Sequence, residues 1–90
     1  MSLDQHPIPQ PGIVSQIVQE EAVIVLPHRG EVKVLNAVGA RIWALADGTR
    51  SLRQISATIA AEYAVEQPQA EADTLAFVDD LAQRGLLRLT

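Results

Sequence analysis

Cysteine is absent from this chain, which excludes disulfide bonds, thiol catalysis and cysteine-ligated metals. Aromatic residues are scarce, with one tryptophan, one tyrosine and one phenylalanine in 90 residues, so the core must be mainly aliphatic. No apolar run approaches the roughly 20 residues that a membrane-spanning helix needs, and the N-terminus lacks a basic-then-apolar signal pattern. We therefore expect a cytoplasmic protein without a membrane partner.

Basic residues are also few: seven lysines and arginines stand against eleven aspartates and glutamates, giving a formal net charge of −4. An acidic protein gains no electrostatic attraction to a phosphate backbone, the term that dominates non-specific nucleic-acid affinity. The composition therefore argues against a nucleic-acid partner. A winged-helix DNA-binding regulator stays open as the alternative, because Arg50 and Arg53 flank the start of a predicted helix.

Nearly half of the residues are hydrophobic, which predicts a packed core, and the length suits one domain. Residues 1–12 hold three prolines and a glycine without hydrophobic periodicity, and we expect a flexible, extended N-terminal arm there. The folded domain then covers residues 13–90. The first part of this domain predicts three strands, over residues 13–18, 22–26 and 31–35. A turn, Pro27-His28-Arg29-Gly30, is predicted between the second and third strands.

Three helices follow, each with recognisable end signals. Their predicted ranges are 37–47, 52–63 and 68–84. Asn36 and Ser51 are suited to the N-cap positions of the first two helices. Gly48 and Gly85 are suited to end the first and the third. Residues 86–89 return as a short strand or pack as a tail. This order predicts an α+β fold, a winged helix-turn-helix with a three-stranded antiparallel sheet followed by three helices.

No catalytic or metal-binding constellation is apparent. His6 and His28 have no partner at metal-ligand or catalytic spacing. Asp79 and Asp80 are adjacent, but neighbouring residues on a helix point about 100° apart, so the two carboxylates do not converge. Ser51 lacks a nearby general base, and helix capping explains it. We predict neither enzymatic activity nor a cofactor or metal.

The strand over residues 31–35, EVKVL, is the main candidate for a binding surface. At a sheet edge its unpaired backbone groups could accept another chain as an added strand. Lys33 points to the face opposite Val32 and Val34, and a charged residue on an exposed edge discourages self-pairing. On the residues alone, an ordinary wing strand protected by this lysine fits slightly better than a peptide-binding edge.

Two ordered patterns between Leu35 and Ile55, LN-x-x-G-x-x-I-W and D-G-x-R-S-x-x-x-I, resemble the PqqD-like family. A weaker similarity continues through Asp73, Phe77 and Gly85. Members of this family are small, non-catalytic recognition elements for ribosomally made precursor peptides. The resemblance implies that this chain binds a leader segment as an added strand between its third strand and third helix, and presents the peptide to a processing enzyme.

Carried over by position, the resemblance gives one wall of the groove to the third strand and the other to one stripe of the third helix. The implied residues are Val32, Lys33, Val34 and Leu35 for backbone pairing, and Asp73, Ala76, Phe77, Asp80 and Arg84 for the opposite wall. Asp73 and Asp80 would suit a basic leader residue. Phe77 would suit an apolar or aromatic anchor.

The implied partners are a precursor leader peptide and a leader peptidase or other modifying enzyme. A lasso-peptide pathway is favoured, because such systems separate the leader binder from the leader peptidase. A third hypothesis is a structural subunit that tethers an enzyme without gripping a peptide.

Overall fold

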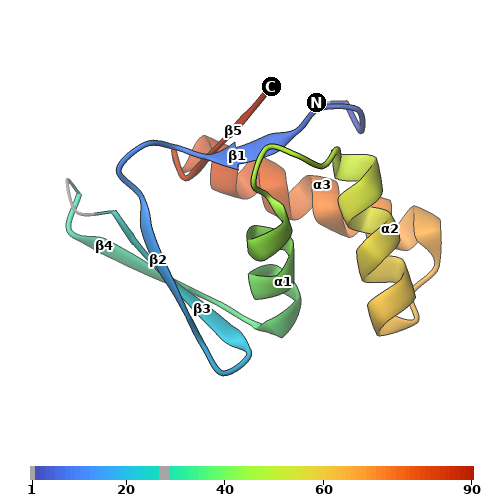
Figure 1. Cartoon of the computed structure of the whole chain (residues 1–90), viewed down its shortest axis with the longest axis horizontal. Coiled ribbons are helices and arrows are strands. Elements are labelled where there is room, and N and C mark those ends of the chain that lie inside the picture. The colour runs from blue at the N-terminus through green and yellow to red at the C-terminus, as the bar shows by residue number, and fades with distance from the viewer. Residues whose placement is uncertain (1, 27–28) are drawn as a thin grey trace.

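The computed structural model describes residues 2–26 and 29–90. In chain order the elements are β1 (Pro7–Pro9), β2 (Val14–Val18), β3 (Glu21–Leu26), β4 (Glu31–Leu35), α1 (Ala37–Leu45), α2 (Leu52–Tyr63), α3 (Gln67–Gln83) and β5 (Leu87–Leu89). The predicted α+β arrangement is confirmed: β2, β3 and β4 form an antiparallel sheet in that order, and three helices follow. Figure 1 shows the helices on one side of this sheet. The predicted turn before β4 includes Pro27 and His28, which lie outside the described residues.

The sheet has one buried and one open face, because side chains alternate along a strand. Three alternate residues of β3 are buried towards the helices, namely Ala22, Ile24 and Leu26. The intervening Val23 and Val25 pair with Val34 and Val32 of β4. Val34 and Val32 are 59% and 63% exposed, so the face turned away from the helices is open and rich in valine.

The helix ends follow the local chemistry of the sequence. The Asn36 side chain accepts a hydrogen bond from the Gly39 N–H at 2.9 Å and caps α1. Ser51 and Gln54 form a reciprocal capping box at the start of α2. Both predicted N-caps are therefore confirmed. Helix α3 starts at Gln67, one residue before the predicted Pro68.

The core between the sheet and the helices is aliphatic, as the composition predicts. Fully or almost fully buried side chains come from every layer, including Ile24, Leu52, Ile55, Val78 and Leu81. Trp43 is the large aromatic side chain of this core, with 6% exposure. Residues 86–89, predicted as a strand or a tail, form strand β5 over Leu87–Leu89.

The prediction of a flexible arm over residues 1–12 is wrong for residues 7–9. Pro7–Pro9 form β1, which pairs antiparallel with β5 in a separate two-stranded ribbon, and Pro7 is buried. Carbonyl groups of the same segment also accept hydrogen bonds from helix α2: Gln5 from Leu52 and Leu3 from Arg53, each at 2.9 Å. Both ends of the chain are consequently tied to the helices (Figure 1).

Candidate functional site

The sheet register shows which backbone groups of each edge strand are free. A two-residue turn joins β2 to β3, and Val18 pairs with Glu21 across it. Residues that flank such a turn bond to each other, and alternate residues of the middle strand then bond to opposite neighbours. Glu21 therefore bonds towards β2, and Ala22 bonds towards β4.

The same alternation applies along β4. Leu35 and Lys33 pair with Ala22 and Ile24 of β3, so their backbone groups face β3. The backbone N–H and C=O groups of Val32 and Val34 consequently point to the other side, where no described strand pairs with β4. This row of free donors and acceptors is the edge that the sequence predicted.

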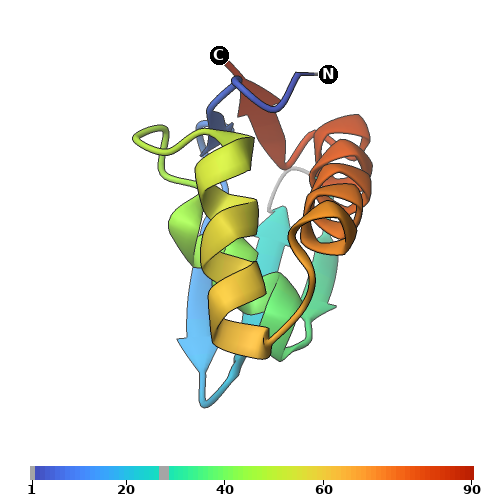
Figure 2. The same cartoon turned by 90° about the vertical axis from the view of Figure 1, so that its right-hand side faces the viewer.

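Helix α3 lies beside this free edge and runs antiparallel to β4. At one end of β4, Arg84 shares a hollow with Glu31 and Val32. Beyond the other end, the Phe77 ring lies against Gly39: a Cβ built on this glycine would be 3.0 Å from the ring. Figure 2 shows α3 on the side of β4 and β2 at the opposite side of the sheet.

The hollow between β4 and the C-terminal end of α3 has a volume of about 260 Å³. It is lined by Leu26, Glu31, Val32, Lys33, Val34, Arg84 and Leu86. The leucines at its base are almost fully buried, and charged side chains stand at its rim. It therefore combines an apolar floor, a polar rim and a free strand edge.

The structure brings four of the predicted site residues into this hollow: Val32, Lys33, Val34 and Arg84. The backbone pairing predicted for Lys33 and Leu35 does not fit this register, because their N–H and C=O groups face β3. The Leu35 side chain lies in the core with 3% exposure. The other predicted residues of α3 do not line this hollow, although Asp73, Ala76 and Asp80 are exposed on the helix and Phe77 is half-buried.

Sequence reasoning missed three lining residues, Leu26, Glu31 and Leu86. Glu31 lies two residues before Lys33, so its side chain is on the same face of the strand. The alternation of side chains along β4 could therefore have predicted it as a lining residue. Leu26 and Leu86 belong to the neighbouring strand and to the chain after α3, so only their packing brings them to the hollow.

The acidic residues of α3 are already partnered. Asp80 accepts hydrogen bonds from the Arg84 Nε atom at 3.2 and 3.1 Å. Asp73 accepts one from Gln69, and Asp79 accepts one from Gln83. Each partner lies one helical turn away, and adjacent Asp79 and Asp80 have separate partners.

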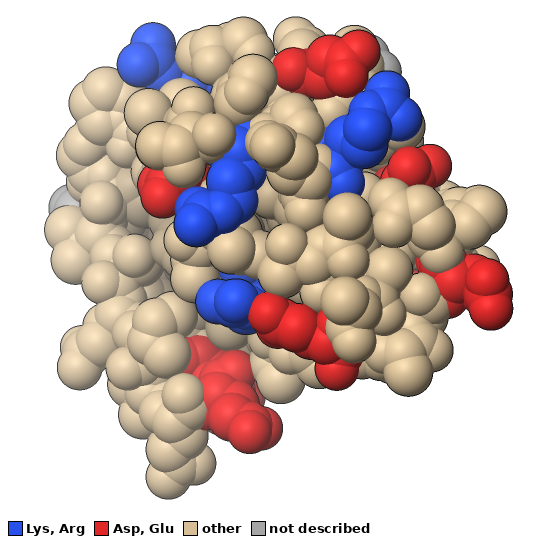
Figure 3. Space-filling view, turned by 45° about the vertical axis from the view of Figure 1, so that its right-hand side comes forward, with Lys and Arg blue, Asp and Glu red and all other residues tan. Residues whose placement is uncertain are grey.

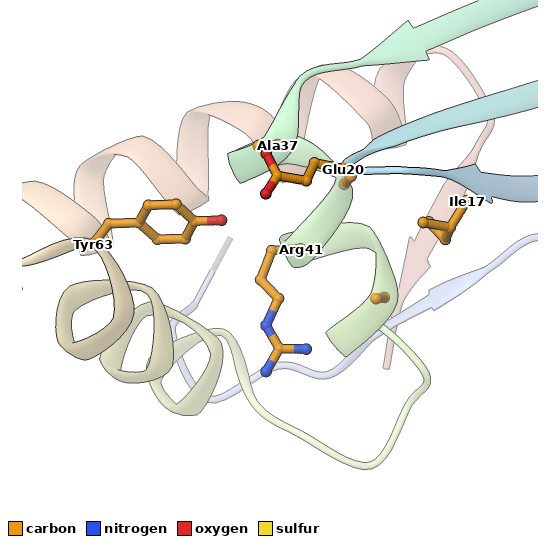
Figure 4. A pocket seen from close by; sticks show the side chains of 7 residues that line it. Ile17, Glu20, Ala37, Arg41 and Tyr63 are labelled. Atoms are coloured by element: carbon orange, nitrogen blue, oxygen red, sulfur yellow. The ribbon is translucent and has the colours of Figure 1, made fainter.

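A second hollow, of about 320 Å³, lies at the other edge of the sheet, next to β2 (Figure 4). Its lining is Ile17, Glu20, Ala37, Ala40, Arg41, Ala44 and Tyr63. Three alanines of α1 and Ile17 make it mostly apolar. None of the predicted site residues borders it.

Arg41, at the rim of the second hollow, forms an ion pair with Glu62 at 2.8 Å and so joins α1 to α2. The hydrogen bonds from Arg41 lower the pKa of Glu62 below its ordinary value. The same contacts raise the pKa of Arg41. Both side chains are well exposed, so this pair orients two helices at the surface.

The described part of the chain contains no cluster of three or more histidine, aspartate or glutamate side chains placed to hold a metal ion. Within residues 2–26 and 29–90, no helix is both long and apolar enough to cross a membrane. The lining of the first hollow offers backbone hydrogen bonding, apolar contact and charge.

Fold and site together define a small winged-helix domain with an open strand edge beside a helix. Residues 21–87 match the family described as coenzyme PQQ synthesis protein D (PqqD). The chain belongs to the PqqD family.

Curated relatives and a solved structure agree with this assignment. A PqqA binding protein of Xanthomonas euvesicatoria pv. vesicatoria (strain 85-10) is 38% identical over 71 residues, covering 79% of this chain and 75% of the relative. A PqqA binding protein of Rhodopseudomonas palustris (strain HaA2) is 35% identical over 65 residues, covering 72% and 62%. TbiB1, solved in complex with the TbiA(beta) leader peptide, is similar with a TM-score of 0.84 and 33% identity, over 90% of this chain and 94% of TbiB1.

Proposed function

We propose that this protein is a non-catalytic adaptor that binds the leader segment of a ribosomally made precursor peptide and presents it to a processing enzyme. The observation that carries the proposal is the free edge of β4, which borders a hollow with an apolar floor at the C-terminal end of α3. The names of the PqqA-binding relatives and the leader-bound state of TbiB1 support the same partner class.

The leader would bind as an added strand along β4. Val32 and Val34 offer two N–H donors and two C=O acceptors, and each backbone bond contributes about 0.5–1.5 kcal/mol net. Backbone hydrogen bonds do not depend on which side chains the leader carries. Contacts in the hollow would therefore determine the register in which the leader pairs with β4. A leader side chain on the face towards α3 would reach Leu26 and Leu86 at its base.

The remaining predicted residues would form the far wall. Phe77 would offer an apolar contact near the end of β4, and Ala76 leaves room beside it. Asp73 and Asp80 would attract a basic leader residue. Because Asp80 is paired with Arg84, such a residue would have to share or displace that arginine.

The processing enzyme we favour is the leader peptidase of a lasso-peptide pathway. The similarity to TbiB1, whose structure contains a leader peptide, supports a leader-binding role. Another modifying enzyme, including one that acts on a PqqA-like precursor, fits the same adaptor chemistry.

Proline substitution on the two edges of the sheet tests strand addition. Val34→Pro removes an outward N–H and places a ring against the incoming strand, so leader binding should weaken at least about tenfold. Ser15→Pro is the matched control, because alternation places the Ser15 N–H at the free edge of β2. The measurement is fluorescence polarisation with the labelled leader of the precursor encoded beside this gene.

Equal binding by wild type and Val34→Pro would overturn strand addition along β4. Failure to bind the leader, together with salt-dependent retention on duplex DNA, would favour the DNA-binding alternative. An enzyme that co-purifies equally well with wild type and Val34→Pro, without any leader binding, would favour a purely structural subunit.

A further inference from the structure

Lys33 is the basic side chain that β4 directs into the hollow, and it has no ion-pair partner among the described residues. It lies on the same face of the sheet as the buried Leu35, and it pairs across the ladder with Ile24, which is fully buried. Leu26 and Leu86 line the same hollow. The ammonium group therefore stands beside apolar surface, where an added strand would remove water from it.

Other charged groups surround this position. The Arg84 guanidinium is held by Asp80, and the Arg84 carbonyl accepts a hydrogen bond from Arg29 at 3.5 Å. Glu31 lies two residues from Lys33 on the same face and also lines the hollow. Three cations thus stand against two carboxylates, and the excess charge at this end of the groove is positive.

Strand geometry brings one residue of an incoming peptide to Lys33. Because the backbone groups of Lys33 face β3, a residue directly opposite it on an added strand would occupy a non-hydrogen-bonded pair. Side chains approach most closely in such pairs, with Cβ atoms about 4.5–5.5 Å apart, and opposite charges there attract. The peptide residue two positions further towards Phe77 would face Leu35 and the aromatic ring.

We infer that Lys33 selects an aspartate or glutamate in the leader, two positions from an apolar residue that lies towards Phe77. The inference rests on the proposed leader-binding function and adds to it the charge of the recognised segment. It also gives Lys33 a second role, since the same charge discourages pairing between two copies of the free edge.

A displayed library of random 12-residue peptides, selected on immobilised protein, tests this inference. Wild type should enrich peptides with Asp or Glu two positions from an apolar residue. Lys33→Glu should lose that preference and enrich Lys or Arg at the same position. Arg53→Glu is the matched control: it makes the same charge change on α2, where Arg53 contacts only Asp4 among described carboxylates, and should keep the acidic preference.

Individual peptides then give the size of the effect. Replacing the selected Glu by Gln should weaken binding to wild type by about two- to fivefold, the range for cross-strand ion pairs, and should leave binding to Lys33→Gln unchanged. An acidic preference that persists in Lys33→Glu, or peptides without any acidic preference, would overturn the inference alone. A library that yields no peptide sensitive to Val34→Pro would overturn the proposed function as well.

Discussion

Gly39 shows how one missing side chain shapes the site. A Cβ built at this position would lie 3.0 and 3.1 Å from two carbons of the Phe77 ring and 3.3 Å from the Asn36 side-chain oxygen. The glycine therefore lets α3 approach the first turn of α1 and keeps the N-cap of that helix in place. The sequence placed Gly39 within the family pattern, but its spatial partner is visible only in the fold.

Gly39→Ala should lower the free energy of unfolding by about 1 kcal/mol. The gain in helix propensity, about 1 kcal/mol, is outweighed by overpacking against Phe77 that costs about 1–3 kcal/mol. Urea unfolding of Gly39→Ala, Phe77→Leu and the double variant measures the coupling. If Gly39→Ala costs as much in the Phe77→Leu background as it does in wild type, the ring is not the obstacle.

Asp80 illustrates a residue whose partner changes its expected role. The helical stripe that contains Asp80 and Arg84 was predicted, and both are exposed on α3 as expected. Their spacing of four also predicts an ion pair, which forms at 3.1 Å. The Asp80 carboxylate is therefore already paired with a cation, whereas Lys33 has no ion-pair partner among the described residues.

At the scale of elements, the N-terminal strand is the largest departure from expectation. Its prolines correctly indicate extended backbone, because proline fixes φ and cannot donate a hydrogen bond. They do not indicate a partner. In the fold, β5 is that partner: it pairs antiparallel with β1, and His6 and Thr90 exchange backbone hydrogen bonds next to the ribbon. The Pro7 carbonyl also accepts a hydrogen bond from the Gly48 N–H at 2.9 Å.

Deletion of residues 2–9 should destabilise the domain strongly, by several kcal/mol. It removes backbone bonds to β5, to Gly48 and to the first turn of α2, each contributing about 0.5–1.5 kcal/mol, and a domain of this size has little stability in reserve. Asp4→Ala is the control, because it removes only the exposed pair with Arg53 and should cost less than about 1 kcal/mol. Urea midpoints that match for the deletion and wild type would show that β1 is dispensable.

On the scale of the whole molecule, Arg41, Arg50, Arg53 and Arg84 each pair with a carboxylate. Figure 3 shows basic and acidic side chains interspersed on one face, several of them side by side. Arg50 is paired with Asp47, and Arg53 with Asp4, so the arginines that kept a DNA-binding alternative open are both neutralised locally.

Acid should weaken the fold through its paired carboxylates. Hydrogen bonds from Arg41 lower the pKa of Glu62 below 4.5, and those from Thr49 lower the pKa of Asp47 below 3.8. A lowered pKa in the folded state contributes stability that is complete above the ordinary value and is lost as the pH falls through the lowered one. The fall in stability below about pH 4.5 should therefore be smaller in Glu62→Gln than in wild type.

Chemical denaturation across that pH range measures this effect. Glu20→Gln serves as the charge-matched control, because Glu20 has no ion pair with any described residue. An acid slope that is the same in Glu62→Gln and wild type would show that the Arg41–Glu62 pair does not link α1 to α2 energetically.

By itself, the sequence determined the three strands β2, β3 and β4 and the three helices of this protein. Alternation in EVKVL, the caps at Asn36 and Ser51, and the helical periods all depend on residues close in the chain, so local patterns are enough to predict them. Only the tertiary structure decided which residues from distant parts of the chain lie against one another. Leu26 and Leu86 form the floor of the hollow, Phe77 meets Gly39, and β1 pairs with β5 across almost the whole chain, because packing between distant segments has no local signal.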